Sequence, residues 1–377
     1  MVKKIAFGTT RLDQGLLGPG IDGIGYYCKA LLQEFSNETH LQIQPFSFGV
    51  KNSPSRAICL PRYATYLKTS LVRKSVGNAW PSQANSWFDE ADLVHSTDQL
   101  IPFGIKKPLI TTVMDTIPLT HPQFVRSVLV PAKALLWKKL VQQSAHIITI
   151  SEFSKAAIAE EMQFPLERIS AIALGVGEEY FERIEKSAIE NVLTKYAISK
   201  NFFLTIGSIQ PRKNLKHILQ AHATLPKEMA TEFPIILIGK LAWDDGTILD
   251  SIRQSVLQNR CIWLDYVTDY EKRCLLQASS GLVFASLYEG FGLPILEAYA
   301  SRTPVITSDN TAMPEIAGDA AILVNASNID DLAAAFLRLI HGGDSINQLT
   351  QRAYERAKKY SWKSTTLETK LVYEKLL

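Results

Sequence analysis

Two consecutive series of short apolar segments, alternating with longer amphipathic stretches, constrain the fold of this chain more than any other feature. Alternation of this kind predicts parallel strands joined by crossover helices. In the first series we expect strands at Lys4–Gly8, Leu41–Phe48, Leu93–His95, Pro108–Val113 and His146–Ile150, and helices at Ile24–Phe35, Pro131–Ser144 and Ser154–Met162. In the second series, which follows residues 171–180, we expect strands within 201–208, 233–240, 261–267, 281–287 and 303–309, and helices at Leu215–Leu225, Thr247–Leu257, Asp269–Ala278, Pro294–Ala300 and Ile329–His341.

Two such series predict an α/β protein made of two Rossmann-like domains that face each other across a cleft. A length of 377 residues also exceeds what one ordinary core supports. We place the first domain at residues 1–178 and the second at 179–359, with a C-terminal helix at 360–377 that packs back on the first. Because ligands of such sheets bind beyond the carboxyl ends of the strands, the cleft is the expected binding site.

Composition narrows the class of protein. A net charge of only +3 argues against a nucleic-acid partner. The four cysteines include no Cys-x-x-Cys pair, which is typical of free thiols in a reducing compartment. The opening MVKKIAFGTT indicates a first strand rather than a signal peptide, and no run approaches the ~20 apolar residues of a spanning helix. We therefore expect a cytoplasmic protein, which could still sit on the inner face of the membrane.

The stretch GPGIDGIG (18–25) has the glycine spacing of a dinucleotide-binding turn. Such glycines must follow the first strand directly, yet residues 9–17 intervene, and Pro19 removes a backbone donor. NAD binding is therefore not expected. We interpret residues 9–22 as a flexible loop, followed by Gly23 and Gly25 at a helix start, where backbone N–H groups can meet an anion. A glycine-rich turn without a ligand is the alternative.

A second glycine-rich stretch, SLYEGFGLPILEAYA (286–300), lies between an apolar strand and a helix. Pro294 suits the first helical turn, where a backbone N–H is not needed. The N–H groups of Phe291, Gly292 and Leu293 would then lie at the positive end of the helix dipole, which is an anion site of the kind that a diphosphate requires. Glu297 could accept hydrogen bonds from a vicinal diol such as that of ribose.

The segment EGFGLPILEA resembles the signature of retaining glycosyltransferases of family 4, with the E-x7-E pattern formed by Glu289 and Glu297. IGSIQPRKNL (206–215), LDYVTDYEKRCLL (264–276) and TPVITSDNTAMPEIAGDAAILVN (303–325) are similar to further segments of that family, and so are GIDGIGYYCKALL, DLVHSTDQLIP, TTVMDTIPLTHPQF and ITISEFSK in the first half. The resemblance extends over nearly the whole chain and implies the GT-B fold.

The resemblance also implies roles for individual residues in binding a UDP- or GDP-linked sugar. Arg212 and Lys213 would neutralise the diphosphate and stabilise the leaving nucleotide. Gly207, in the same segment, would also belong to the donor-binding site. Glu289 would hydrogen-bond the transferred sugar, and Glu297 the ribose.

Three further parts of the donor site follow from the same resemblance. The backbone at Tyr266 and Val267 would meet the base. The turn from Gly290 would present the helix N-terminus to the phosphates, and Gly23 and Gly25 would close on the diphosphate from the opposite domain. No metal and no cofactor are implied.

The sequence departs from the family pattern in three places. Ser208 replaces a usual arginine, which leaves Arg212 with more of the phosphate charge. A first-domain His-Asp pair near the reacting sugar is Met114-Asp115 here, so Asp115 is the remaining candidate for positioning the sugar or the acceptor hydroxyl. Arg302 stands where a glycine is usual, with no consequence that we can derive.

Two groups of first-domain residues allow two interpretations each. His95 and Asp98 follow a strand and could border the acceptor, although a buried, hydrogen-bonded histidine explains the first equally well. Residues 39–88 contain no Asp or Glu but several Lys and Arg interleaved with aromatic residues. The basic stretch 51–74 within this segment could bind anionic lipid or the diphosphate of a lipid-linked acceptor. A solvated helix face with packing aromatics is the alternative.

Together these features predict a retaining, metal-independent transferase that moves a hexose from a nucleoside diphosphate sugar to a saccharide or lipid-linked saccharide in polysaccharide biosynthesis. UDP-glucose is the first expected donor and GDP-mannose the second. A GT-B nucleotide-sugar epimerase and a non-catalytic sugar-nucleotide-binding protein remain the alternatives.

Overall fold

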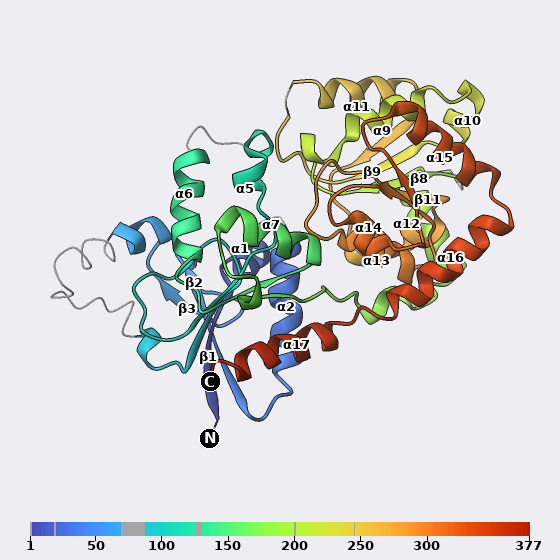
Figure 1. Ribbon diagram of the computed structural model, residues 1–377. Coiled ribbons are helices and arrows are strands. Elements are labelled where there is room, and N and C mark those ends of the chain that lie inside the picture. The colour runs from blue at the N-terminus through green and yellow to red at the C-terminus, as the bar shows by residue number, and fades with distance from the viewer. Residues whose placement is uncertain (1, 19, 69–86, 126–129, 200, 245) are drawn as a thin grey trace. The chain divides into compact units, whose positions relative to one another are not determined.

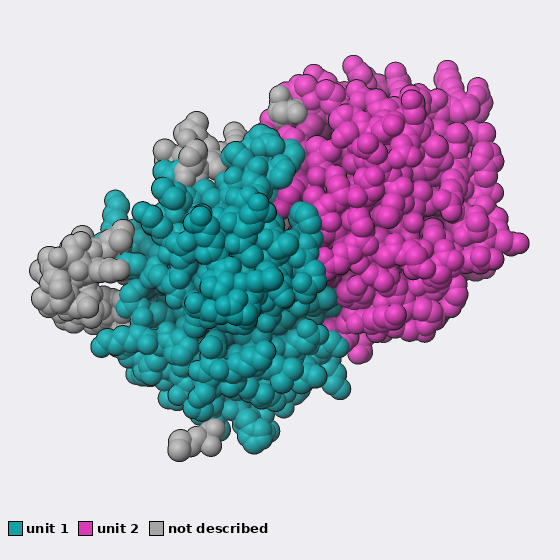
Figure 2. Space-filling view, viewed as in Figure 1, with its two compact units in different colours: residues 1–175, 362–377 teal, residues 176–361 magenta. Residues whose placement is uncertain are grey.

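The computed structural model describes residues 2–18, 20–68, 87–125, 130–199, 201–244 and 246–377. The chain divides into two compact units (Figure 2): unit 1 contains Met1–Gly175 and Trp362–Leu377, and unit 2 contains Val176–Ser361. Each unit has its own parallel sheet with helices around it (Figure 1).

The described part of unit 1 has a seven-stranded sheet in the order β3-β2-β1-β4-β5-β6-β7, and every pair in it is parallel. The strands are β1 (Lys3–Gly8), β2 (Leu41–Phe48), β3 (Ile58–Leu60), β4 (Leu93–Ser96), β5 (Leu109–Thr112), β6 (His146–Thr149) and β7 (Ile169–Ala171). The main helices are α1 (Thr10–Leu17), α2 (Gly23–Phe35), α5 (Ile117–Thr120), α6 (Val130–Val141), α7 (Glu152–Met162) and α17 (Trp362–Glu374).

The described part of unit 2 has a six-stranded parallel sheet in the order β10-β9-β8-β11-β12-β13. The strands are β8 (Phe203–Ile206), β9 (Ile235–Ile238), β10 (Cys261–Leu264), β11 (Gly281–Phe284), β12 (Val305–Ser308) and β13 (Ile322–Val324). The α-helices are α8 (Lys186–Lys195), α9 (Leu215–Ala223), α10 (Lys227–Glu232), α11 (Ile248–Leu257), α12 (Asp269–Ala278), α13 (Leu293–Ala300), α14 (Met313–Ala317), α15 (Ile329–His341) and α16 (Asp344–Ala357), and η3 (Glu178–Tyr180) and η4 (Pro211–Lys213) are short 3-10 helices.

Both sheets have the doubly wound strand order, in which the direction of winding reverses beside the first strand. The reversal lies between β1 and β4 in unit 1 and between β8 and β11 in unit 2. At such a point the connections leave the two neighbouring strands toward opposite faces, so the carboxyl ends of these strands border an open crevice. We therefore expect a binding site of unit 2 to lie in the chain segments that follow β8 and β11.

The strand sequences explain why these sheets are buried on both faces. β9 (IILI), β11 (GLVF) and β12 (VITS) are buried at every position, as expected for parallel strands covered by helices. In unit 2 the core packs Phe203, Val283 and Ile306 against Phe336 of α15. Because the two ends of each strand are fixed by this packing, residues just beyond them are held in place.

The C-terminal helix α17 belongs to unit 1. The Tyr373 hydroxyl lies 2.7 Å from Nδ1 of His95, and the ring of Tyr373 stacks on Phe35 of α2. The Thr365 hydroxyl donates to the carbonyl oxygen of Ala173 at 2.7 Å. These contacts fasten the last residues of the chain to the first sheet.

Every strand and helix expected from the two apolar series is present, but residues 9–22 are not the flexible loop that we expected. They contain helix α1, whose Leu12 is buried. Asp13 is also buried, and its carboxylate accepts hydrogen bonds from the hydroxyls of Thr9 and Ser55. These polar contacts fix a segment whose composition alone indicates a loop.

Candidate functional site

A pair of adjacent cations, Arg212 and Lys213, lies beyond the carboxyl end of β8. They form the end of the 3-10 helix η4, and Asn214 follows with a left-handed backbone (φ +60°). The buried Asn214 amide donates to the carbonyl oxygens of Ala285 (3.0 Å) and Ala326 (2.7 Å), which follow β11 and β13. This amide therefore ties the residue that follows the cation pair to the segments after β11 and β13.

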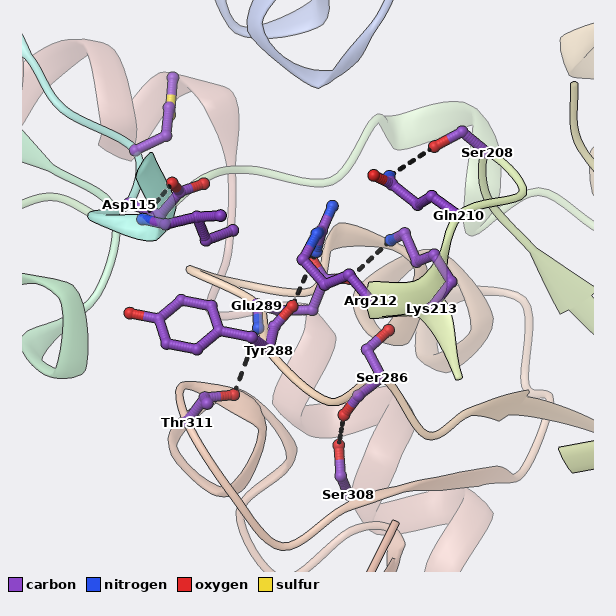
Figure 3. A network of polar contacts seen from close by, with 12 residues as sticks. Asp115, Ser208, Gln210, Arg212, Lys213, Ser286, Tyr288, Glu289, Ser308 and Thr311 are labelled. Atoms are coloured by element: carbon purple, nitrogen blue, oxygen red, sulfur yellow. Dashed lines mark hydrogen bonds and ion pairs between the residues drawn. The ribbon is translucent and has the colours of Figure 1, made fainter. Parts of the chain in front are cut away.

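Glu289, from the segment after β11, pairs with both cations (Figure 3). Its Oε2 lies 2.6 Å from Nη1 of Arg212, and its Oε1 lies 2.6 Å from Nζ of Lys213. All three side chains are largely buried, with 12–15% of each exposed. The structure thus brings together residues 76 positions apart, because β8 and β11 are neighbours in the sheet.

Backbone contacts hold the segment after β11 in register with the cation pair. The Leu287 N–H donates to the carbonyl oxygen of Arg212 at 2.9 Å, and Nη1 of Arg212 donates to the carbonyl oxygen of Tyr288 at 2.7 Å. On the far side, the Ser308 hydroxyl donates to the carbonyl oxygen of Ser286 at 2.7 Å (Figure 3). The geometry of the site is therefore fixed by contacts among the ends of β8, β11 and β12.

The charges of this cluster perturb each other. Burial raises the pKa of the Glu289 carboxyl, but the charges of Lys213 and Arg212 outweigh burial and lower that pKa to about 2. Burial lowers the pKa of Lys213, and the charge of Glu289 opposes that effect. With two cations and one carboxylate the cluster carries a net positive charge, which suits an anionic ligand.

We expect Glu289→Gln to change how stability depends on pH. A carboxyl whose pKa falls from 4.5 to about 2 on folding stabilises the protein above the higher value, and that contribution is lost as the pH falls toward the lower one. The stability difference between wild type and Glu289→Gln should therefore shrink between about pH 5 and pH 2. Urea unfolding at several pH values measures it. The exposed Glu190 on α8 provides the control, and an equal pH dependence for Glu190→Gln and Glu289→Gln would contradict the expectation.

The N-terminus of α13 lies in the same segment, four residues after Glu289. Gly292 is its N-cap residue with a left-handed backbone (φ +101°), no side chain caps the helix, and Pro294 occupies its second position. Phe291 is buried against the ring of Tyr360, which belongs to the same unit. The helix begins one residue earlier than we expected, at Leu293, and no side chain caps it. A diphosphate bound at this helix start stays a prediction.

Glu297 lies in a second polar cluster of unit 2. It is buried on α13, and its Oε1 accepts hydrogen bonds from Tyr180 Oη and Lys272 Nζ, both at 3.0 Å. Sequence reasoning did not single out Tyr180 or Lys272. Tyr180 lies at the start of unit 2 and Lys272 on α12, and no spacing in the sequence connects either one to Glu297.

The proposed base loop lies between β10 and α12. Val267 is buried and Tyr266 is 60% exposed. A capping box between Thr268 and Glu271 fixes the start of α12, so the loop before it has a defined end. The main-chain contacts to a base that the resemblance implied here stay a prediction.

In unit 1, Gly23 and Gly25 form the start of α2. The Asp22 carboxylate caps this helix by accepting a hydrogen bond from the Gly25 N–H at 2.8 Å, and it also pairs with Arg11. The Gly25 N–H is thus already engaged. A side chain at Gly23 would meet no other atom within 4 Å. A role for this helix start in diphosphate binding stays a prediction.

The acceptor-side candidates occupy different environments. His95 is fully buried between the hydroxyls of Tyr373 and Thr112, each 2.7 Å from a ring nitrogen, and burial lowers its pKa to about 3. His95 is therefore a buried, hydrogen-bonded histidine, which was the alternative to a residue that borders the acceptor. Asp98 is also buried, its Oδ1 accepts from the Leu100 N–H, and burial raises its pKa to about 6. Asp115 is partly exposed, and its Oδ1 accepts from the Ile117 N–H at 3.0 Å.

All three departures from the family pattern lie within the described residues. The Ser208 hydroxyl accepts a hydrogen bond from the Gln210 side chain at 2.8 Å (Figure 3), so a short polar pair occupies the position of the usual arginine. The Met114 carbonyl accepts from the Ser154 hydroxyl at the start of α7. Arg302 has a left-handed backbone (φ +59°), and its guanidinium lies 3.6 Å from the ring centre of Tyr354.

Part of the basic stretch 51–74 lies at the edge of the first sheet. Lys51 and Arg62 border a surface hollow of about 880 Å³, together with Leu60 and Trp87. Residues 69–74 of the stretch, which include Arg73 and Lys74, lie outside the described residues. A helix of sufficient length and apolarity to cross a membrane is absent from the part of the chain that the structure describes.

Comparison with known proteins shows that most of the second unit matches one protein-family model. Residues 190–358 match the family model described as "Glycosyl transferases group 1", and this range contains Arg212, Lys213, Glu289 and Glu297. The O-antigen chain mannosyltransferase B of Escherichia coli is 33% identical over 231 residues, which are 61% of this chain and 60% of that protein. The chain thus aligns with less than two thirds of that relative.

Solved structures match the chain over almost its whole length. Sucrose-phosphate synthase from Thermosynechococcus elongatus matches with a TM-score of 0.76 and 17% identity over 99% of both chains. Anabaena Alr3699/HepE, solved in complex with UDP and glucose, matches with a TM-score of 0.75 and 16% identity, also over 99% of both chains. At this identity the likeness shows the fold, so the chain has the GT-B fold with two Rossmann-like domains, and the predicted fold class is confirmed.

Proposed function

We propose that this chain is a retaining glycosyltransferase that moves a hexose from a nucleoside diphosphate sugar to a saccharide or lipid-linked saccharide in polysaccharide biosynthesis. The observation that carries the proposal is the buried cluster of Arg212, Lys213 and Glu289 at the carboxyl ends of β8 and β11. This cluster lies within the segment that matches the glycosyl transferases group 1 model. The proposal includes no metal and no cofactor.

In this proposal Arg212 and Lys213 stabilise the negative charge of the leaving nucleotide. As the glycosidic bond breaks, negative charge grows on the diphosphate. Arg212 and Lys213, held in place by Asn214 and the strand ends, are positioned to stabilise that charge without reorganisation. The N-terminus of α13 adds the positive end of a helix dipole. In this proposal these groups perform the role that a divalent ion has in other transferases.

Glu289 positions the transferred sugar. Its low pKa keeps it ionised, so it can accept hydrogen bonds from sugar hydroxyls and cannot serve as a proton donor. Each carboxylate oxygen can accept a further bond beyond its cation. We assign no covalent nucleophile: the leaving phosphate oxygen takes the proton of the acceptor hydroxyl on the same face of the sugar, which retains the anomeric configuration.

We propose mannose, from GDP-mannose, as the transferred sugar. Support comes from the 33% identical relative, whose name describes a mannosyltransferase. UDP-glucose, our first expectation from the sequence, has support only from fold neighbours such as Alr3699/HepE with UDP and glucose, at 16% identity.

On the acceptor side we propose Asp115 as the residue that positions the sugar or the acceptor hydroxyl, and Asp98 as a neighbour of the acceptor. They follow β5 and β4, which are adjacent strands, so both lie at the carboxyl edge of the first sheet. We also propose that the enzyme is cytoplasmic and contacts the membrane through the basic stretch 51–74, which suits an acceptor linked to anionic lipid.

A ligand panel tests the proposal. We expect GDP-mannose to raise the melting temperature, because a ligand that binds only the folded state stabilises it by mass action. UDP-glucose and ADP-glucose are the comparison ligands. With a saccharide acceptor, GDP-mannose should be consumed much faster than without one, and NMR of the product should show the α-configuration of the donor. The absence of any nucleotide-dependent shift would overturn the proposal.

The same assays separate the alternatives. An epimerase would change the sugar of the donor with no acceptor present. A non-catalytic binding protein would show the thermal shift but neither donor consumption nor product. Met114, in place of a usual histidine, is the feature that favours the latter, so Met114→His is a useful companion variant.

A further inference from the structure

Three elements of unit 2 meet at one oxygen of the Glu297 carboxylate. Glu297 lies on α13, Lys272 on α12, and Tyr180 at the end of η3. The Tyr180 hydroxyl and the Lys272 ammonium both donate to Oε1 at 3.0 Å. Glu297 is 7% exposed and Tyr180 is 6% exposed, so these donors determine how the carboxylate is oriented.

The three side chains also form one compact group, in which Lys272 pairs with Glu297 at 3.0 Å and, more distantly, with the exposed Asp269 of its own helix at 3.8 Å. The Lys272 ammonium lies 5.3 Å from the ring centre of Tyr180, within the range of a cation–π interaction. The Lys272 side chain is 14% exposed, so its attraction to Glu297 is little screened by water. A buried carboxylate without such a partner is costly and tends to rotate or to take up a proton.

We propose that Lys272 and Tyr180 are positioning residues that hold the Glu297 carboxylate as a hydrogen-bond acceptor for the vicinal hydroxyls of the nucleotide ribose. This inference rests on the proposed function, in which Glu297 binds the ribose. Both donors meet on Oε1, so they restrain the position of that oxygen relative to α13. A carboxylate fixed in this way can bind a diol without first losing rotational freedom.

A purely structural role makes a different prediction. If the contacts only tie α12 and η3 to α13, then removing them lowers stability and affects all nucleotide ligands alike. If they position Glu297, then their removal weakens only ligands that carry the ribose hydroxyls. The ratio of affinities for a ribonucleotide and its dideoxy form therefore separates the two roles.

The experiment measures dissociation constants of GDP and UDP, each beside its 2′,3′-dideoxy form, by calorimetry. We expect the wild type to prefer the ribonucleotide by about tenfold or more, the value of a hydrogen bond to a charged group. In Lys272→Met we expect the ribonucleotide to bind about tenfold more weakly, with the preference reduced to near one. Tyr180→Phe should reduce the preference by a smaller factor. In the transfer reaction both variants should raise the KM for the donor more than they lower kcat.

Lys195→Met is the matched control. Lys195 pairs with Glu271, which also lies on α12, so this variant removes an ion pair from the same helix without touching Glu297. We expect its nucleotide preference to equal that of the wild type. Should Lys272→Met not fold, the preference ratio of Tyr180→Phe, which loses a single oxygen, decides the question.

The possible outcomes separate the inference from the function on which it rests. If the wild type binds neither GDP nor UDP, the proposed function fails. If the wild type binds a nucleotide but ignores the ribose hydroxyls, or if Lys272→Met and Tyr180→Phe keep the full preference, then the positioning role is overturned while the proposed function stands.

Discussion

Lys213→Ala is expected to reduce hexose transfer by at least about 100- to 1000-fold while the protein stays folded. The Lys213 ammonium is buried beside Glu289 and lies 4.6 Å from the ring centre of Phe284, where little water screens it. In the proposed reaction it faces the growing charge of the leaving diphosphate, so its removal costs more in the transition state than in the ground state. Steady-state kinetics with GDP-mannose measures the loss in kcat.

Lys216→Ala, three residues later on α9, is the control for this variant. It removes a partly exposed lysine from the same segment and should leave kcat within a factor of about two, as is usual for surface changes away from a site. Circular dichroism and the melting temperature establish that both variants are folded. Transfer by folded Lys213→Ala at the wild-type rate would refute the role that we assign to this lysine.

Glu289→Ala provides a contrast within the same cluster. It should also abolish transfer, because the sugar loses its positioning group. However, Glu289 competes with a diphosphate for Arg212 and Lys213, to which it is paired at 2.6 Å. We therefore expect Glu289→Ala to bind GDP at least as tightly as the wild type, and Lys213→Ala to bind it more weakly. Equal weakening in both variants would show that the carboxylate supports nucleotide binding rather than opposing it.

The fold could be predicted where hydrophobic patterns are long enough to be distinctive. Runs such as FPIILIGK place β9 within two residues, since a continuous apolar segment that ends in glycine fits a buried parallel strand. The edge strands β3 (ICL) and β7 (ISA) have three residues each and no periodicity to detect. Helix α1 was missed because its sequence, TRLDQGLL, is fixed by contacts of Thr9 and Asp13 with a residue about 40 positions away, Ser55.

The site could be predicted only in part, because some of its contacts join residues that are far apart in the sequence. Helix-start chemistry is local, so the pattern Gly292-Leu293-Pro294 could be interpreted from the sequence alone. The pairing of Glu289 with Arg212 and Lys213 depends on which strands are neighbours, and no short-range pattern encodes this. The resemblance to a family identified these residues individually, and the strand order of the sheet explains why they meet. Lys272 lies in one of the segments that carry the resemblance and Tyr180 does not, but no role followed for either residue, and only the structure connects them to Glu297.

The strand ends beside the cation pair depend on a close approach of two glycines. Gly239 follows β9 with a φ of +156°, and a side chain there would place its Cβ 1.9 Å from the carbonyl oxygen of Gly207. Gly207 itself has a φ of +142°, and a Cβ on it would lie 3.1 Å from Cε of Lys213. The backbones after β8 and β9 can therefore lie side by side, with Lys213 against them, only because neither residue has a side chain.

Gly239→Ala is expected to destabilise unit 2 by about 3 kcal/mol or more, since it combines an unfavourable backbone conformation with a clash that no side-chain rotation relieves. Gly343→Ala separates the two effects. Gly343 also has a left-handed backbone (φ +91°), but a Cβ there meets no atom within 4 Å, so only the conformational cost of about 1–2 kcal/mol applies. Urea unfolding of both variants measures the difference.

Because relief of the clash must move Gly207, folded Gly239→Ala should also bind GDP more weakly, whereas Gly343→Ala should not. Equal destabilisation of the two variants, with GDP binding intact, would show that the close approach of the glycines is not what holds Lys213 in place.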